Sequence, residues 1–168
     1  MPASPENIQA YLETYLSLLP VELADGPQGE VLPGVLKILQ TLQQDQTVVQ
    51  GLLTGNQARG AEYKLSHYRV WDYFEFGAYA DDSADRNELG PHAQRRAKET
   101  HGVDFAPERT YIVGDTPFDI ECGKVINAQT IAVATGGYTR DELIAHEPTA
   151  LFDDLTDSAA FYRALGIE

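Results

Sequence analysis

Asp115 and Asp119 stand four residues apart, directly after an apolar run, in the stretch YIVGDTPFDIECG. Two carboxylates one helical turn apart at the end of a strand can reach one hard cation such as Mg²⁺, which prefers oxygen ligands. Asp119 has an alternative role, because Thr116 and Asp119 also have the spacing of a helix capping box, with Pro117 at the first helical position. The pattern predicts a metal site at Asp115, with Asp119 as either a second ligand or a cap.

A second polar group, Thr54-Gly55-Asn56, follows another apolar run, TVVQGLL. The Thr54 hydroxyl and the backbone N–H groups of Gly55 and Asn56 would lie at the start of the next helix, where the helix dipole favours an anion. The same three residue types are also common in a plain turn with a helix cap. The stretch therefore predicts either a phosphate-binding loop or a turn.

Arg86 is the third candidate, in the segment DRNEL before a predicted helix. A cation near a helix N-terminus opposes the dipole, so an arginine there favours a task outside its own helix, such as binding an anion. The alternative is a solvated side chain satisfied by the neighbouring Asp85 and Glu88.

These groups are positioned by strands that alternate with helices. Strands are predicted at 47–53, 73–79, 110–114 and 130–135, and helices at about 57–67, 89–101, 117 onward and 139–146. Further helices are predicted at 7–19, which Pro20 should end, at 35–42 and at 155–165. This alternation favours an α/β fold, Rossmann-like, with a parallel sheet and helices on both faces. Ligands of such sheets bind at the carboxyl ends of the strands, where the three candidate groups stand.

Composition narrows the class of protein. The chain has 168 residues, a formal net charge of −14 and a single cysteine. The charge argues against nucleic acid or an anionic membrane as a partner, since both would be repelled. One cysteine excludes an intrachain disulfide, and the four histidines lack zinc-site spacing. Without a recognisable signal peptide or an apolar run of about 20 residues, we expect a soluble, cytoplasmic protein.

Taken together, LLTGN, DRNEL and IVGDTPFDI resemble the second, third and fourth motifs of the haloacid dehalogenase (HAD) superfamily, in order. The following TIAVATGGYTRDEL and FDDL are similar to its phosphoglycolate-phosphatase-like branch. The resemblance implies that Thr54, Gly55, Asn56 and Arg86 bind the phosphoryl group of a small phosphorylated metabolite, with Thr54 and Arg86 catalytic. It also implies that Asp115 and Asp119 serve a Mg²⁺ ion.

The family's first motif, DxDGT after an apolar strand, is not found in this sequence. That motif supplies the aspartyl nucleophile, and its strand is central in the family's sheet, so we expect a gap at that position. By the same resemblance, residues 1–30 are a remnant of a helical cap domain with its linker, and residues 31–168 the α/β core. Three explanations fit: a fragment or misassigned start, which we favour; a diverged, non-catalytic relative; or a strand from another segment or partner chain.

The leading hypothesis is therefore a Mg²⁺-dependent phosphomonoester hydrolase by lineage, acting through an aspartyl-phosphate, with this chain inactive alone. A non-catalytic phosphate- or metal-binding module is the alternative, and a haloacid dehalogenase is a further one. An open gap in the sheet would favour self-association.

Overall fold

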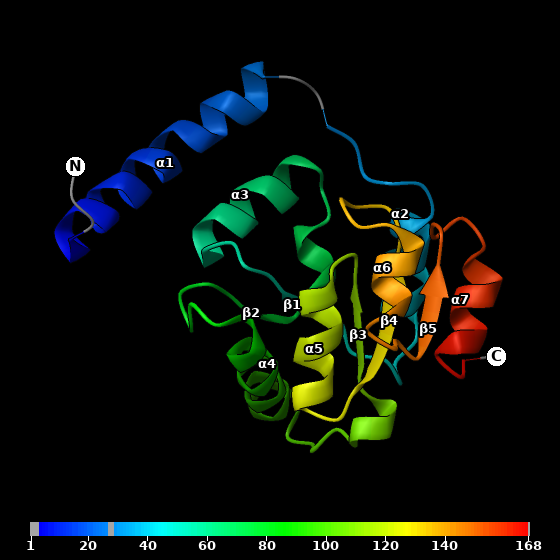
Figure 1. The fold of residues 1–168 in the computed structure, drawn as a ribbon. Helices are drawn as coiled ribbons and strands as arrows, with labels where there is room; N and C mark the ends of the chain where they lie inside the picture. The colour runs from blue at the N-terminus through cyan, green and yellow to red at the C-terminus, as the bar shows by residue number, and fades with distance from the viewer. Residues whose placement is uncertain (1–3, 27–28, 168) are drawn as a thin grey trace.

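The computed structural model describes residues 4–26 and 29–167 as an α/β fold with a long N-terminal helix (Figure 1). The α-helices are α1 (Pro5–Asp25), α2 (Val35–Gln44), α3 (Ala58–His67), α4 (Arg86–His101), α5 (Pro117–Val125), α6 (Arg140–Ile144) and α7 (Ser158–Ala164). The strands are β1 (Gly51–Leu53), β2 (Phe76–Ala78), β3 (Tyr111–Gly114), β4 (Gln129–Val133) and β5 (Ala150–Phe152). Short 3₁₀ turns occupy Trp71–Tyr73 and Pro107–Arg109.

All strand pairs are parallel, but among the described residues they form two separate ladders. β1 pairs with β2, while β3, β4 and β5 form a three-stranded sheet in that order. Figure 1 shows β1 and β3 as the inner strands of the two ladders. The predicted parallel α/β fold is confirmed, and its strands form two half-sheets.

Within the part of the chain that the structure describes, no strand pairs with the edge of β3 that faces away from β4. The Thr110 carbonyl accepts a hydrogen bond from the Gln129 N–H at the start of β4. Backbone groups alternate between the two sides of a strand, so those of Tyr111 and Val113 point away from β4. Val113 is 43% exposed, which is unusual because strands of parallel sheets are normally covered on both faces.

β1 presents a matching open edge. The Gln50 carbonyl, directly before β1, accepts a hydrogen bond from the Glu75 N–H directly before β2. By the same alternation, the backbone groups of Gly51 and Leu53 point away from β2. The two half-sheets therefore turn unpaired edges toward a gap, at the position where the resemblance to the HAD superfamily predicts one.

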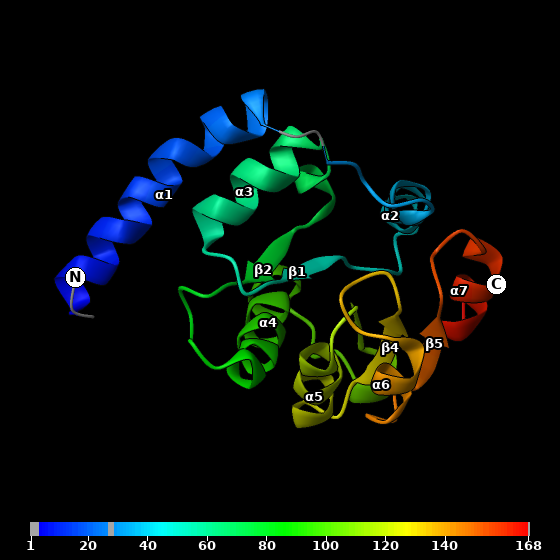
Figure 2. The ribbon, with the colours of Figure 1, turned by 45° about the horizontal axis from the view of Figure 1, so that its top comes forward.

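Helices cover both faces of the strands, with α2 and α3 on one face and α4, α5 and α6 on the other (Figure 2). Two apolar clusters lie on opposite faces of β4, through its neighbouring residues Ile131 and Ala132. The first contains Ile38 and Leu42 of α2 with Ile131 and Phe161. The second contains Ile120, Ala132 and Leu143. The three-stranded half-sheet thus has a hydrophobic core on each face.

Several predicted boundaries are wrong. α1 continues through Pro20 to Asp25, because an internal proline removes one backbone hydrogen bond but need not end a helix. The strands predicted at 47–53 and 73–79 shrink to three residues each, since each has one partner and residues 71–73 form a 3₁₀ turn. β5 was not predicted, because three residues give too short a pattern.

Gly34 closes the turn into α2 with a positive φ of 87°. A Cβ atom at this position would overlap the backbone carbonyl of Leu155, so the glycine allows the segment before α2 to contact the segment after β5. We expect Gly34→Ala to lower the free energy of unfolding by about 2 kcal/mol in thermal or denaturant unfolding, from the left-handed conformation plus the overlap.

Gly102→Ala is the matched control for this prediction. Gly102 also has a positive φ, 70°, but a Cβ atom there meets nothing within 4 Å. Gly102→Ala should therefore lower the free energy of unfolding by only about 1 kcal/mol, from the left-handed conformation alone. Equal losses for the two variants would show that the contact between Gly34 and Leu155 is not tight.

Candidate active site

A hollow of about 430 Å³ opens at the carboxyl ends of β1 and β3. All six residues predicted from the sequence line it: Thr54, Gly55, Asn56, Arg86, Asp115 and Asp119. Because residues after β1 and residues after β3 meet in one hollow, the two inner strands run in the same direction. The structure therefore brings the predicted phosphate-binding and metal-binding residues together across the gap.

Thr54 is oriented by the residue two positions later. Its Oγ1 accepts hydrogen bonds from the backbone N–H of Asn56, at 3.1 Å, and from the Asn56 side-chain Nδ2, at 2.9 Å. Among the described residues, the hydroxyl of Thr54 donates to no acceptor. Since both bonds use the oxygen as acceptor, its hydrogen remains to donate to a ligand oxygen.

The loop 54–57 does not cap α3 as the turn hypothesis proposed. Gln57 occupies the N-cap position without a side-chain hydrogen bond, and the backbone N–H of Ala58 instead donates to Asp81 Oδ2 at 2.6 Å. The first N–H of α3 is thus already used. The anion-binding groups that this loop can offer are the Thr54 hydroxyl and the Gly55 N–H.

The segment that holds the start of α3 is itself held by an ion pair. Arg96 of α4 donates to both carboxylate oxygens of Asp82, at 2.6 Å each, with one of its nitrogens also donating to the Gly77 carbonyl. The hydrogen bonds from Arg96 lower the pKa of Asp82 below its ordinary value. The pair therefore keeps the loop after β2 in place beside the loop that follows β1.

Arg86 is the first residue of α4 rather than a loop residue, because Asp85 is the N-cap and accepts from the Asn87 N–H. Its guanidinium does not pair with Asp85 or Glu88, as the alternative proposed. It crosses to α5 and donates through Nη2 to Asp119. The Arg86 Nε is buried and has no partner among the described residues, whereas Nη1 lies beside Gly55 and makes no hydrogen bond to a described residue.

Asp119 is 5% exposed and both of its oxygens are engaged. Oδ2 accepts from the Thr116 backbone N–H at 3.1 Å and from the Thr116 hydroxyl at 2.7 Å, while Oδ1 accepts from Arg86. The Thr116 hydroxyl also accepts from the Asp119 N–H, which completes the capping box. The capping alternative is confirmed, and Oδ1, which accepts only from Arg86, is the Asp119 oxygen with a lone pair left for a metal ligand or water.

Asp115 differs from Asp119 because its carboxylate makes no hydrogen bond or ion pair within the part of the chain that the structure describes. It packs against Gly136, where a Cβ atom would overlap Oδ2 of Asp115. No group of three or more acidic, histidine or cysteine side chains that could hold a metal occurs among the described residues. One available carboxylate still suits Mg²⁺, which keeps waters and binds through one or two carboxylates plus substrate phosphate.

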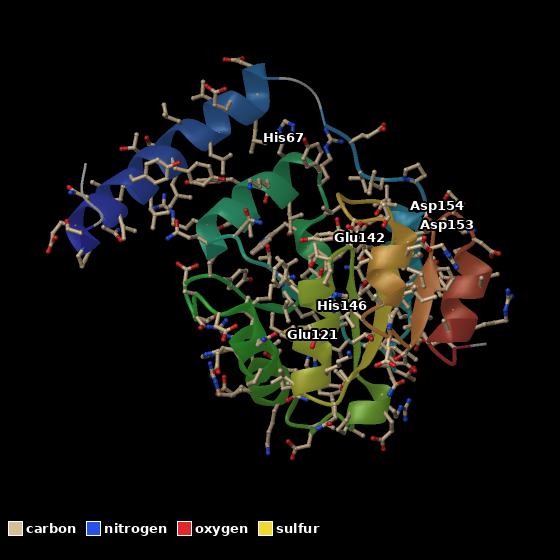
Figure 3. The ribbon with its side chains drawn as sticks, viewed as in Figure 1. His67, Glu121, Glu142, His146, Asp153 and Asp154 are labelled. Carbon is tan, nitrogen blue, oxygen red and sulfur yellow. The ribbon has the colours of Figure 1, made fainter. Side chains whose placement is uncertain are left out.

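Asp154 was not singled out from the sequence, although it belongs to the stretch FDDL. With Asp115 and Thr135 it lines a second hollow of about 320 Å³, which shares Val113, Gly114 and Asp115 with the first. Figure 3 shows Asp154 beside Asp153 near the carboxyl end of β5. The Asp154 Oδ1 accepts a hydrogen bond from the Thr156 N–H, two residues later, at 2.8 Å. This oxygen therefore helps to hold the turn after β5.

Comparisons with known proteins agree with this geometry. The HAD-hydrolase-like family model matches residues 87–158. The probable phosphatase IndB of Dickeya dadantii is 28% identical over 98% of this chain and 70% of its own length. The pyrophosphatase PpaX of Bacillus mycoides is 27% identical over 64% of this chain and 48% of its own length. The structure of CbbY from Rhodobacter sphaeroides in complex with phosphate is also similar, with a TM-score of 0.72 and 20% sequence identity. The match covers 94% of this chain and 67% of the CbbY chain.

The parallel strands and their helices define an α/β fold similar to that of CbbY, and the sequence is similar to that of a probable phosphatase. Over residues 87–158 the chain is similar to the haloacid dehalogenase-like hydrolases. Among the described residues, no helix has the length and apolarity needed to cross a membrane.

Proposed function

We propose that this chain carries the substrate site of a Mg²⁺-dependent phosphomonoester hydrolase of the phosphoglycolate-phosphatase-like type. The observation that carries the proposal is the single hollow in which a hydroxyl donor, an arginine and an unpaired carboxylate meet. The names of IndB and PpaX, a phosphatase and a pyrophosphatase, support phosphoryl chemistry. The proposed substrate is a small phosphorylated metabolite.

Phosphate binding falls to the loop after β1 and to Arg86. The Thr54 hydroxyl and the Gly55 N–H donate to phosphoryl oxygens, and Asn56 holds Thr54 in place. Arg86 neutralises the phosphoryl charge, which a protein with a net charge of −14 cannot do by its overall field. Such positioning and charge neutralisation supply most of the catalysis in phosphoryl transfer.

Asp115 is the proposed Mg²⁺ ligand, because its carboxylate is available in the hollow. Asp119 supports the site indirectly, by orienting Arg86 and capping α5, or through a water molecule. When bound, the metal ion neutralises charge that builds up on the phosphoryl group.

The nucleophile is proposed to come from a strand that fills the gap between β1 and β3. The open backbone groups of both inner strands would pair with such a strand, and its carboxyl end would reach the hollow that contains Thr54 and Asp115. An aspartate there would attack the phosphorus atom, the ester P–O bond would break and the alcohol would leave with a proton from solvent; water would then hydrolyse the aspartyl-phosphate and release phosphate. Without that strand, we propose that the chain binds phosphate but does not turn it over.

The test is phosphate release from p-nitrophenyl phosphate by the natural protein, including any residues beyond these 168, with and without Mg²⁺. We expect Mg²⁺-dependent release, and a loss of at least about tenfold in Asp115→Asn, because a metal ligand is removed. Asp153→Asn is the matched control, since Asp153 is 80% exposed and pairs with Arg140. No release from several small phosphomonoesters in Mg²⁺ would overturn the hydrolase proposal.

A second candidate is a non-catalytic phosphate- or metal-binding module, favoured by the pairing of Arg86 with Asp119 inside the site. It predicts a rise in Tm on adding Mg²⁺ and phosphate, without turnover by the natural protein. Dehalogenation, the further alternative, would need the same missing aspartate but not Mg²⁺, so it gives no reason for the available carboxylate of Asp115.

A further inference from the structure

Lys64 of α3 contacts the phosphate-binding loop although it does not line the hollow. Its Nζ donates to Asn56 Oδ1 at 2.7 Å. Asn56 in turn donates through Nδ2 to the Thr54 hydroxyl oxygen at 2.9 Å. These two bonds form a continuous chain, which we call the Lys64 relay, from the ammonium group of Lys64 through Asn56 to Thr54.

The chemistry of the Lys64 relay fixes a direction at each step. An ammonium group is only a donor, so Lys64 selects the oxygen of the Asn56 side-chain amide. The amide nitrogen is then the end that faces Thr54, and it can only donate. Thr54 must accept, so its own hydrogen points toward another acceptor. In the hollow, that acceptor is the position proposed for a phosphoryl oxygen.

Packing against α1 holds the ammonium group in this position. The Lys64 Nζ lies 5.9 Å from the centroid of the Tyr15 ring, within the range of a cation–π interaction. Figures 1 and 2 both show α1 lying along α3. Gly60 of α3 lies at the contact between the helices, since a Cβ atom there would be at ordinary van der Waals distance from Leu16 and Tyr15. The lysine therefore lies between α1 and the loop.

We propose that Lys64 is a positioning residue that orients the Thr54 hydroxyl, through Asn56, for donation to a phosphoryl oxygen. The inference rests on the proposed function for the identity of the ligand, but not for the orientation of Asn56 and Thr54. It also gives α1 a role in the site, since Tyr15 helps to hold the lysine.

The first test measures binding of inorganic phosphate to the 168-residue chain by calorimetry at 0.15 M salt. Lys64→Met, which removes the donor and keeps a similar aliphatic length, should weaken binding about tenfold, the effect of one lost charge-assisted bond. Lys64→Arg should restore most of it. Lys98→Met removes the same charge from the exposed pair with Asp104 and should leave binding within about twofold, because exposed charges are screened. Equal effects of Lys64→Met and Lys98→Met would overturn the proposal.

An Asn56→Ala background separates positioning from a direct charge effect. If Lys64 acts through Asn56, Lys64→Met should change phosphate affinity little once Asn56 is alanine. A full, additive loss in that background would show that Lys64 acts on the anion by itself and would overturn the positioning role.

The second test needs no ligand. In ¹H–¹⁵N NMR spectra of the free chain, Lys64→Met should shift and broaden the Asn56 side-chain amide and shift the Thr54 backbone amide, while Lys98→Met should not. Unchanged Asn56 and Thr54 signals would overturn the Lys64 relay whatever the ligand. If Lys64→Met left these signals unchanged and the chain bound no phosphate, both the Lys64 relay and the proposed function would be wrong. If Lys64→Met changed the signals but the chain bound no phosphate, only the proposed function would be wrong.

Discussion

Replacing Asp119 with alanine is expected to lower Tm by about 6–12 °C, the equivalent of about 3 kcal/mol in the free energy of unfolding for a chain of this size. The variant removes the Asp119 half of the capping box of α5 and leaves Arg86 beside the hollow without its partner. Breaking a buried ion pair costs about 3–5 kcal/mol, while the Thr116 hydroxyl still caps the helix. The estimate stays at the low end because the Arg86 side chain is 27% exposed and water can reach it.

Two further variants test whether loss of the Arg86–Asp119 pair causes the fall in Tm. Asp119→Asn keeps one oxygen for Thr116 but removes the charge that Arg86 needs, so its Tm should fall by an intermediate amount. Asp153→Ala breaks the exposed pair with Arg140 and should leave Tm unchanged within error, because such surface pairs contribute little. If Asp119→Ala melted with the wild type in a thermal scan followed by circular dichroism, the pair and the cap would not be stabilising the fold.

The second large effect should appear in amide hydrogen exchange of the free chain. Along β3, the amide of Ile112 donates within the sheet, while those of Tyr111 and Val113 point toward the gap. Amides without a ladder bond exchange by local fluctuation, whereas bonded amides in a core strand need larger openings. We therefore expect Val113 to exchange on the order of a hundredfold faster than Ile112.

β1 supplies an internal comparison for this exchange experiment. Leu53 should exchange faster than Leu52, because the Leu52 amide faces β2 and the Leu53 amide faces the gap. Uniform protection along both strands would contradict the open edges, and would indicate that another strand pairs with them in solution. Size-exclusion chromatography at the same concentration would then show whether that strand comes from a second copy.

The positions of the site residues could be predicted because they depend on a rule of parallel sheets. Thr54 and Asp115 directly follow apolar runs, and the carboxyl ends of parallel strands lie at one rim. The capping geometry of Thr116 and Asp119 could also be predicted, since it depends on residues three apart in the sequence. The family resemblance added the order of the motifs and the expectation of a gap between β1 and β3.

Contacts between distant segments could not be predicted. Nothing in DRNEL identifies Asp119, 33 positions later, as the partner of Arg86, because the pairing depends on how α4 packs against α5. The same is true of Lys64, which is an ordinary helical lysine by sequence and reaches Asn56 only through its orientation on α3. The continuation of α1 beyond Pro20 was not predicted, because the sequence shows the backbone hydrogen bond that proline removes but not the remaining bonds that keep the helix intact.

The two half-sheets have a consequence for how the site responds to motion. Thr54 and Asn56 belong to the half that contains β1 and β2, whereas Asp115 belongs to the half that contains β3 to β5. The ion pair between Arg86 on α4 and Asp119 on α5 links the two half-sheets. The distance between the donor groups and the available carboxylate is therefore a measure of how far the halves are apart. A ligand that binds both groups at once would hold the two half-sheets together. Its affinity would therefore depend on the free energy needed to bring the half-sheets to the right separation.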